Sequence, residues 1–80
     1  MFKPKKMPEI DAAVQYDDWE YIQIHATVYA DAVQARIAKG DSPQEIYRYV
    51  LRQVGAAREP IALRCLHAAE YLAAQEEQGA

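Results

Sequence analysis

Apolar side chains recur with a helical period along the chain, most clearly between Asp17 and Gly40. On a helical wheel of about 100° per residue, this stretch carries two apolar stripes roughly 150° apart. The first stripe contains Trp19, Ile22, Ala26, Tyr29, Ala30, Val33 and Ile37. The second contains Tyr21, Ile24, Val28, Ala32 and Ala35. Because a surface helix needs one stripe, either this helix is the centre of the fold or one stripe belongs to a partner.

Local end signals predict a first helix over about 17–39. Asp17 and Glu20 have the spacing of a capping box, and Lys39 followed by Gly40 is typical of a helix end. Pro8 also suits a first helical turn, so a start from about residue 9 stays open.

Two further helices are predicted, over about 43–54 and about 60–75. Ser42, Pro43 and Glu45 form a strong start signal, Gly55 is a stop, and Pro60 opens the last helix. The expected buried faces are Ile46, Tyr47, Val50, Leu51 and Val54, followed by Ile61, Ala62, Cys65, Ala68, Ala69 and Leu72. The short link at Gly40 makes helices one and two antiparallel. The predicted fold is therefore all-α, a small antiparallel three-helix arrangement with a long first helix.

The length of 80 residues predicts one domain with a thin core, because much of the 51% apolar content is alanine. Residues 1–8 are expected to form a flexible basic tail, residues 9–76 a single helical domain and residues 77–80 a frayed C-terminus. At this size, self-association or a partner often supplies additional stability.

The net charge of −3 opposes a general nucleic-acid binder, which needs a positive surface. Acidic residues dominate 9–45 and arginines dominate 46–69, so the first helix is expected to lie beside the later ones. The single cysteine, Cys65, allows no internal disulfide, and no apolar run is long enough to span a membrane. A cytoplasmic location is expected.

Residues that could carry catalysis or bind a metal do not converge in this pattern. Cys65 and His67 are two positions apart and point to nearly opposite sides of a helix. The two histidines lack a spaced metal-ligand motif, and His67 with Arg64 and Glu70 is interpreted as a solvated strip. We expect no catalytic residue, no cofactor and no metal, and we expect that the protein is not an enzyme.

Aromatic side chains outside the main buried faces are the strongest functional indication, since such residues favour interfaces. The expected protein-interface residues are Tyr21, Ile24, Val28, Tyr49 and Tyr71. The predicted function is a non-enzymatic protein-interaction module: a small regulator, adaptor or inhibitor that binds a protein partner and self-associates as a homodimer. An inhibitor from a phage or mobile element fits this description.

The alternative function is a DNA-associated transcriptional regulator with a helix-turn-helix in its second and third helices. Its nucleic-acid contacts would be Arg48, Arg52, Arg58 and Arg64. The acidic average and the presence of Glu70 on the outer face of the third helix disfavour it, so nucleic acid is not the expected partner.

Overall fold

The computed structural model describes residues 12–79, and this part of the chain is all-helical. It contains α1 (Ala12–His25), α2 (Thr27–Lys39), α3 (Pro43–Val54), a short 3-10 turn (Ala56–Arg58) and α4 (Glu59–Gly79). The all-α prediction is confirmed, but the predicted count of three helices is wrong because the described residues form four. The predicted tail over residues 1–8 and the possible helix start at residue 9 lie outside the described residues.

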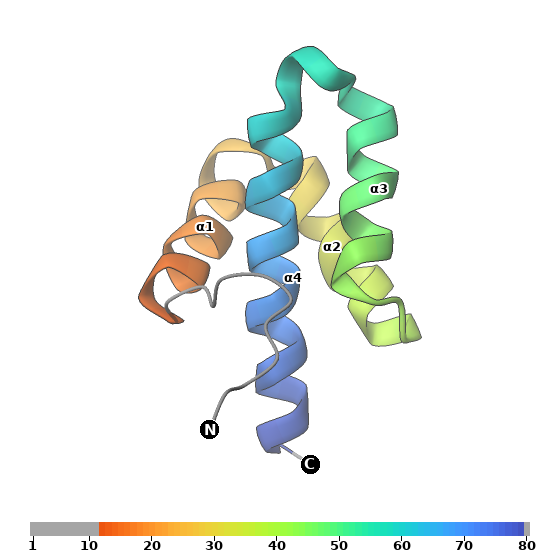
Figure 1. Cartoon of the computed structure of the whole chain (residues 1–80). Coiled ribbons are helices and arrows are strands. Elements are labelled where there is room, and N and C mark those ends of the chain that lie inside the picture. The colour runs from red at the N-terminus through yellow and green to blue at the C-terminus, as the bar shows by residue number, and fades with distance from the viewer. Residues whose placement is uncertain (1–11, 80) are drawn as a thin grey trace, which may run out of the picture.

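The longest helix, α4, lies at the centre of the fold. In Figure 1, α1 lies on one side of α4, α3 lies on the other, and α2 crosses behind it. All three of these helices contact α4. Its side chains at Ala62, Cys65, Ala68 and Ala69 are fully buried. Small side chains allow neighbouring helices to approach closely, so this face of α4 can accommodate several partners at once.

The predicted helix over 17–39 is broken at Ala26. This residue has φ −145° and ψ 56°, which is outside the helical region. The Ala26 N–H still donates to the Ile22 carbonyl over 2.9 Å, and Thr27 Oγ1 donates to the Gln23 carbonyl over 3.3 Å. These bonds satisfy carbonyls at the end of α1. The expectation of one long first helix is therefore wrong.

Packing against α4 accounts for this break. A straight helix over residues 12–39 would be about 42 Å long, whereas α4 is roughly 32 Å long. With the bend, Trp19 and Ile22 from α1, and Val33 from α2, are all buried in one core. The first apolar stripe is thus the buried stripe. This agrees with its side chains, which are larger and more numerous than those of the second stripe.

The start of the first helix also differs from the expected start at Asp17. The chain is already helical at Ala12, so Asp17 lies inside α1 and does not cap it. Contacts with α4 support this earlier turn, because Tyr16 packs edge-on against Tyr71 with ring centroids 5.6 Å apart. Gln15 Nε2 lies 3.4 Å from Glu70 Oε1 as a second contact.

The corner between α2 and α3 is formed by two consecutive caps. Gly40 has φ 100°, and its N–H donates to the Ile37 carbonyl while Asp41 N–H donates to the Arg36 carbonyl. This is the Schellman arrangement, which glycine adopts without steric cost. At the start of α3, Ser42 N–H donates to Glu45 Oε1 over 2.8 Å, and Glu45 N–H donates to Ser42 Oγ over 3.2 Å. The glycine end predicted at Gly40 and the helix start predicted from Ser42, Pro43 and Glu45 are both present.

The α3 boundaries agree with the predicted 43–54, whereas α4 is longer than the predicted 60–75. It begins at Glu59 and continues to Gly79, since no helix-breaking residue intervenes after Pro60. Tyr47 Oη donates to Glu59 Oε2 over 2.8 Å, and this hydrogen bond raises the pKa of the Tyr47 phenol. The contact ties α3 to the first turn of α4.

The buried faces of α3 and α4 follow the predicted positions. Ile46 and Val50 are buried, and Leu51 and Val54 are partly buried beside them. Leu66 of α4 is also buried, although its position was not among those expected in the core.

The structure predicts that the two apolar stripes differ in their effect on stability. Ile22 is fully buried, so Ile22→Asp places a charge in the core and should unfold a domain of this size. Ile24 is 63% exposed, so Ile24→Asp should change the unfolding free energy by less than about 1 kcal/mol. Thermal melts followed by circular dichroism compare the two variants. Equal loss of helicity would show that both stripes belong to the core.

The Cys65 thiol is predicted to react slowly in the folded protein. Burial raises its pKa from 9.0 to about 11, and the side chain is fully buried. At pH 8 the thiolate fraction is then about a hundredfold below that of the unfolded chain. Because the folded pKa is the higher one, this burial contributes stability below about pH 9 that is lost as pH rises towards about 11.

Thiol titration with a chromogenic disulfide at pH 8, in buffer and in denaturant, measures the difference in reactivity. A rate in buffer equal to the rate in denaturant would contradict the buried position. A Cys65→Ala variant, which lacks the titrating group, should have a smaller loss of stability between about pH 9 and pH 11.

Candidate functional site

Asp18 of α1 is the centre of a polar cluster with Arg64 and His67 of α4, here termed the Asp18 cluster. Arg64 Nη1 donates to Asp18 Oδ1 over 2.9 Å, and His67 Nδ1 lies 2.6 Å from Asp18 Oδ2. Only 13% of the Asp18 side chain is exposed. A carboxylate accepts hydrogen bonds only, so His67 contributes an N–H to this contact. The cluster joins α1 to α4 across their polar edge.

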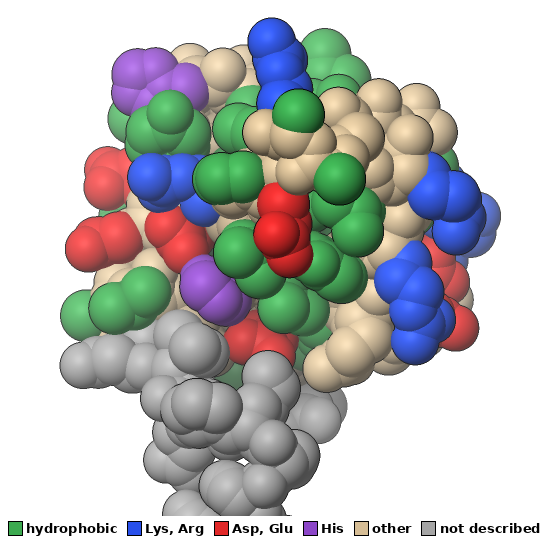
Figure 2. Space-filling model, turned by 45° about the horizontal axis from the view of Figure 1, so that its top comes forward, with side chains coloured by type: hydrophobic (Ala, Val, Ile, Leu, Met, Phe, Trp, Pro, Cys, Tyr) green, Lys and Arg blue, Asp and Glu red, His purple; other side chains and the backbone are tan. Residues whose placement is uncertain are grey.

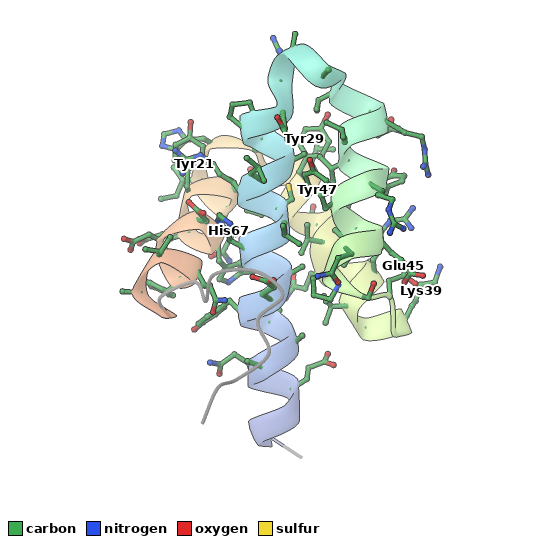
Figure 3. All side chains as sticks on the ribbon, in the orientation of Figure 1. Tyr21, Tyr29, Lys39, Glu45, Tyr47 and His67 are labelled. Atoms are coloured by element: carbon green, nitrogen blue, oxygen red, sulfur yellow. The ribbon has the colours of Figure 1, made fainter. Side chains whose placement is uncertain are left out.

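Tyr21 extends this cluster towards the end of α1. The Arg64 guanidinium carbon lies 3.8 Å from the centroid of the Tyr21 ring, and the centroids of the His25 and Tyr21 rings are 4.6 Å apart. Figure 3 shows Tyr21 and His67 on the same side of α4. The Arg64 guanidinium thus contacts both a carboxylate and an aromatic ring, and these two contacts restrict its orientation.

Two large aliphatic side chains project from the bend between α1 and α2. Ile24 is 63% exposed in the last turn of α1, and Val28 is 76% exposed in the first turn of α2. With Tyr21 they form what we term the junction surface: Tyr21, Ile24 and Val28. Tyr21 differs from the other two because it is partly buried and carries the Arg64 stack. All three residues were predicted interface positions.

The other two predicted interface residues lie elsewhere. Tyr71 is partly buried on α4 against Tyr16. Tyr49 is partly buried on α3, under the guanidinium of Arg36, whose carbon lies 3.7 Å from the ring centroid. The five predicted positions therefore do not form one surface: Tyr49 lies on α3 and Tyr71 on α4, whereas Tyr21, Ile24 and Val28 lie in the second half of α1 and the first turn of α2.

The four arginines predicted as alternative nucleic-acid contacts are also dispersed. Arg48 and Arg52 lie on the exposed side of α3, Arg58 lies in the 3-10 turn, and Arg64 is engaged in the Asp18 cluster. Figure 2 shows basic side chains at the right-hand edge of the molecule, where α3 lies in Figure 1, with acidic side chains beside them. These four residues do not form one continuous basic surface.

The arrangement of α3 and α4 differs from that of a DNA-binding pair. A helix-turn-helix motif places two helices at about 90–120° and leaves the second helix free to enter a groove. Here α3 and α4 lie side by side as an antiparallel hairpin, and α4 is contacted by the three other helices (Figure 1). This geometry does not favour α4 as a reading helix.

The interpretation of His67 as part of a solvated strip is wrong, since His67 and Arg64 pair with Asp18. The charge blocks of the sequence indicated the contact between the first helix and the arginine-bearing helices. They could not identify the residues, because Asp18 and His67 are 49 positions apart.

The described residues place no group of three or more histidine, cysteine, aspartate or glutamate side chains where they could hold a metal ion. Within the same part of the chain, no helix combines the length and hydropathy needed to cross a membrane. Comparison with protein-family models, with curated proteins and with solved structures finds no match to this chain.

The Asp18 cluster is predicted to stabilise the fold. Asp18→Asn removes the charge that Arg64 and His67 contact, and should cost about 1 kcal/mol, a modest value because Arg64 is 38% exposed. Asp17→Asn is the matched control, since Asp17 is the adjacent residue and is exposed. Its effect should stay within about 0.5 kcal/mol. Urea denaturation of both variants checks this, and equal effects would show that the cluster contributes no stability.

Proposed function

We propose that this protein is a non-enzymatic protein-interaction module that binds another protein chain through the junction surface. One observation carries the proposal: Ile24 and Val28 are 63% and 76% exposed on either side of the bend at Ala26. Burial of these two aliphatic side chains by a partner would be favourable, because it would remove apolar surface from water.

The surroundings of these two side chains favour recognition. Tyr21 is held by the Arg64 stack, and Arg64 is in turn held by Asp18, so this edge of the surface is preorganised. A fixed edge loses little side-chain entropy on association. Aromatic and arginine side chains at such an edge are also the types enriched in interfaces.

A second copy of the chain is the proposed partner at the junction surface. Burying one large aliphatic side chain contributes about 1.5–3 kcal/mol, so the exposed parts of Ile24 and Val28 offer roughly 2–4 kcal/mol per copy. A symmetric dimer doubles this to roughly 4–8 kcal/mol, against an association cost of about 4–15 kcal/mol. The dimer is therefore weak, and a partner with a larger apolar groove of its own would displace it.

A weak dimer of this kind suits a small regulator, adaptor or inhibitor, because a protein partner can displace the second copy and bind in its place. Support for a non-enzymatic role comes from the Asp18 cluster, whose ionisable groups are paired with one another. A reducing cytoplasm is the proposed location, since Cys65 is buried and has no second cysteine to pair with. The alternative of a DNA-associated regulator finds less support, because its arginines are dispersed.

Self-association is predicted to depend on Val28. Sedimentation equilibrium should show a monomer–dimer equilibrium with a dissociation constant of about 1 mM, which corresponds to the largest gain and the smallest cost given above. Val28→Glu should leave a monomer with unchanged helicity, because this side chain lies outside the core. Gln34→Glu is the control, since it introduces the same side chain at an exposed position of the same helix.

Either of two results would contradict the assignment. One is a wild-type protein that remains monomeric at millimolar concentration. The other is a dimer that persists in Val28→Glu as strongly as in Gln34→Glu.

A further inference from the structure

A second surface, chemically unlike the first, lies at the corner between α2 and α3. A hollow of about 270 Å³ is lined there by Arg36, Asp41, Glu45, Arg48, Tyr49 and Arg52, and we term it the basic hollow. Figure 3 shows the corner itself, where Glu45 and Lys39 are labelled near each other. The Schellman cap at Gly40 and the capping box at Ser42 fix the two helices at this corner. The lining residues are therefore carried by a rigid frame.

The two carboxylates of the basic hollow are already engaged within the chain. Asp41 Oδ2 lies 3.3 Å from Arg36 Nη1, and Glu45 Oε1 accepts the Ser42 N–H over 2.8 Å. Arg48 and Arg52 have no carboxylate within ion-pairing distance among the described residues. The hollow thus retains positive charge although the whole chain carries −3.

Arg48 and Arg52 are also one helical turn apart on the same side of α3. Like charges at this spacing repel and destabilise a helix. An anion placed between the two guanidinium groups would relieve that repulsion and accept hydrogen bonds from both. The sequence arrangement Glu45, Arg48, Tyr49, Arg52 places all four side chains along one stripe of α3, beside Arg36 of α2.

Tyr49 gives the basic hollow an aromatic wall. The guanidinium carbon of Arg36 lies 3.7 Å from the centroid of the Tyr49 ring. The same guanidinium also forms an ion pair with Asp41. A guanidinium held in this way is preorganised to share an incoming carboxylate.

The size and the charge of the surroundings distinguish the possible anions. A volume of about 270 Å³ suits side chains and is small for a cofactor. A long polyanion such as nucleic acid would also meet the acidic residues of the remaining surface, which repel phosphates. A short acidic peptide can bind within the hollow alone, without contacting those acidic residues.

We propose that the basic hollow binds an acidic segment of a protein partner, with Arg48 and Arg52 pairing with aspartate or glutamate side chains of that segment. This site is separate from the junction surface, and its occupation does not require the dimer. Loss of one interaction therefore leaves the other measurable.

The test is a titration of the full ¹⁵N-labelled chain with a hexaglutamate peptide, followed by two-dimensional NMR. Amide signals of residues 45–52 and the Arg36 side chain should shift, and binding should weaken as salt increases from about 0.02 M to about 0.3 M. Arg48→Gln and Arg52→Gln should each weaken binding about threefold, and the double variant about tenfold. Arg58→Gln, the same change at an exposed arginine outside the hollow, should leave affinity unchanged.

Three results would overturn the proposal. The first is equal affinity of the double variant and wild type, provided that circular dichroism shows equal helicity. The second is tighter binding of hexathymidylate than of hexaglutamate, which would assign the hollow to nucleic acid. The third is the same shifts with inorganic phosphate at equal concentration, which would make the hollow a general oxyanion site.

Discussion

Close approach of three helices to the small side chains of α4 is the constraint on which the rest of the structure depends. Ala62, Cys65, Ala68 and Ala69 have no exposed surface, and they form one broad face of the helix. Larger residues there would separate α1, α2 and α3 and open voids, each of which costs stability. The bulk of the core must then come from the neighbours, and Trp19, Ile22 and Ile46 provide it.

The bend at Ala26 follows from this constraint. One straight helix could cover only one side of α4, whereas two shorter helices cover two of its sides. The bend turns the buried stripe of residues 12–39 around α4, and it leaves Ile24 and Val28 on the outside. The exposed apolar surface is therefore a consequence of how the core is formed, and a partner chain would cover it at no cost to the fold.

The sequence predicts elements whose signals are local. The boundaries of α3 follow from Ser42, Pro43 and Gly55, which act within one helical turn. The break at Ala26 has no such signal, because alanine is the best helix former and no proline or glycine lies nearby. The Asp18 cluster also has no local signal in the sequence. Its residues are 46 and 49 positions apart, so only the tertiary packing of α1 on α4 brings them together.

The junction surface and the basic hollow lie at opposite ends of α2. The first is apolar and the second is positively charged. Val28 and Arg36 are eight residues apart, or about 12 Å along the helix. On the proposed function, apolar burial at one end would supply affinity that depends little on salt. Arginines at the other end would attract acidic chains over about a Debye length and raise the association rate, an effect that salt would screen. A partner that touched both ends would be selected by charge before contact and retained by apolar burial afterwards.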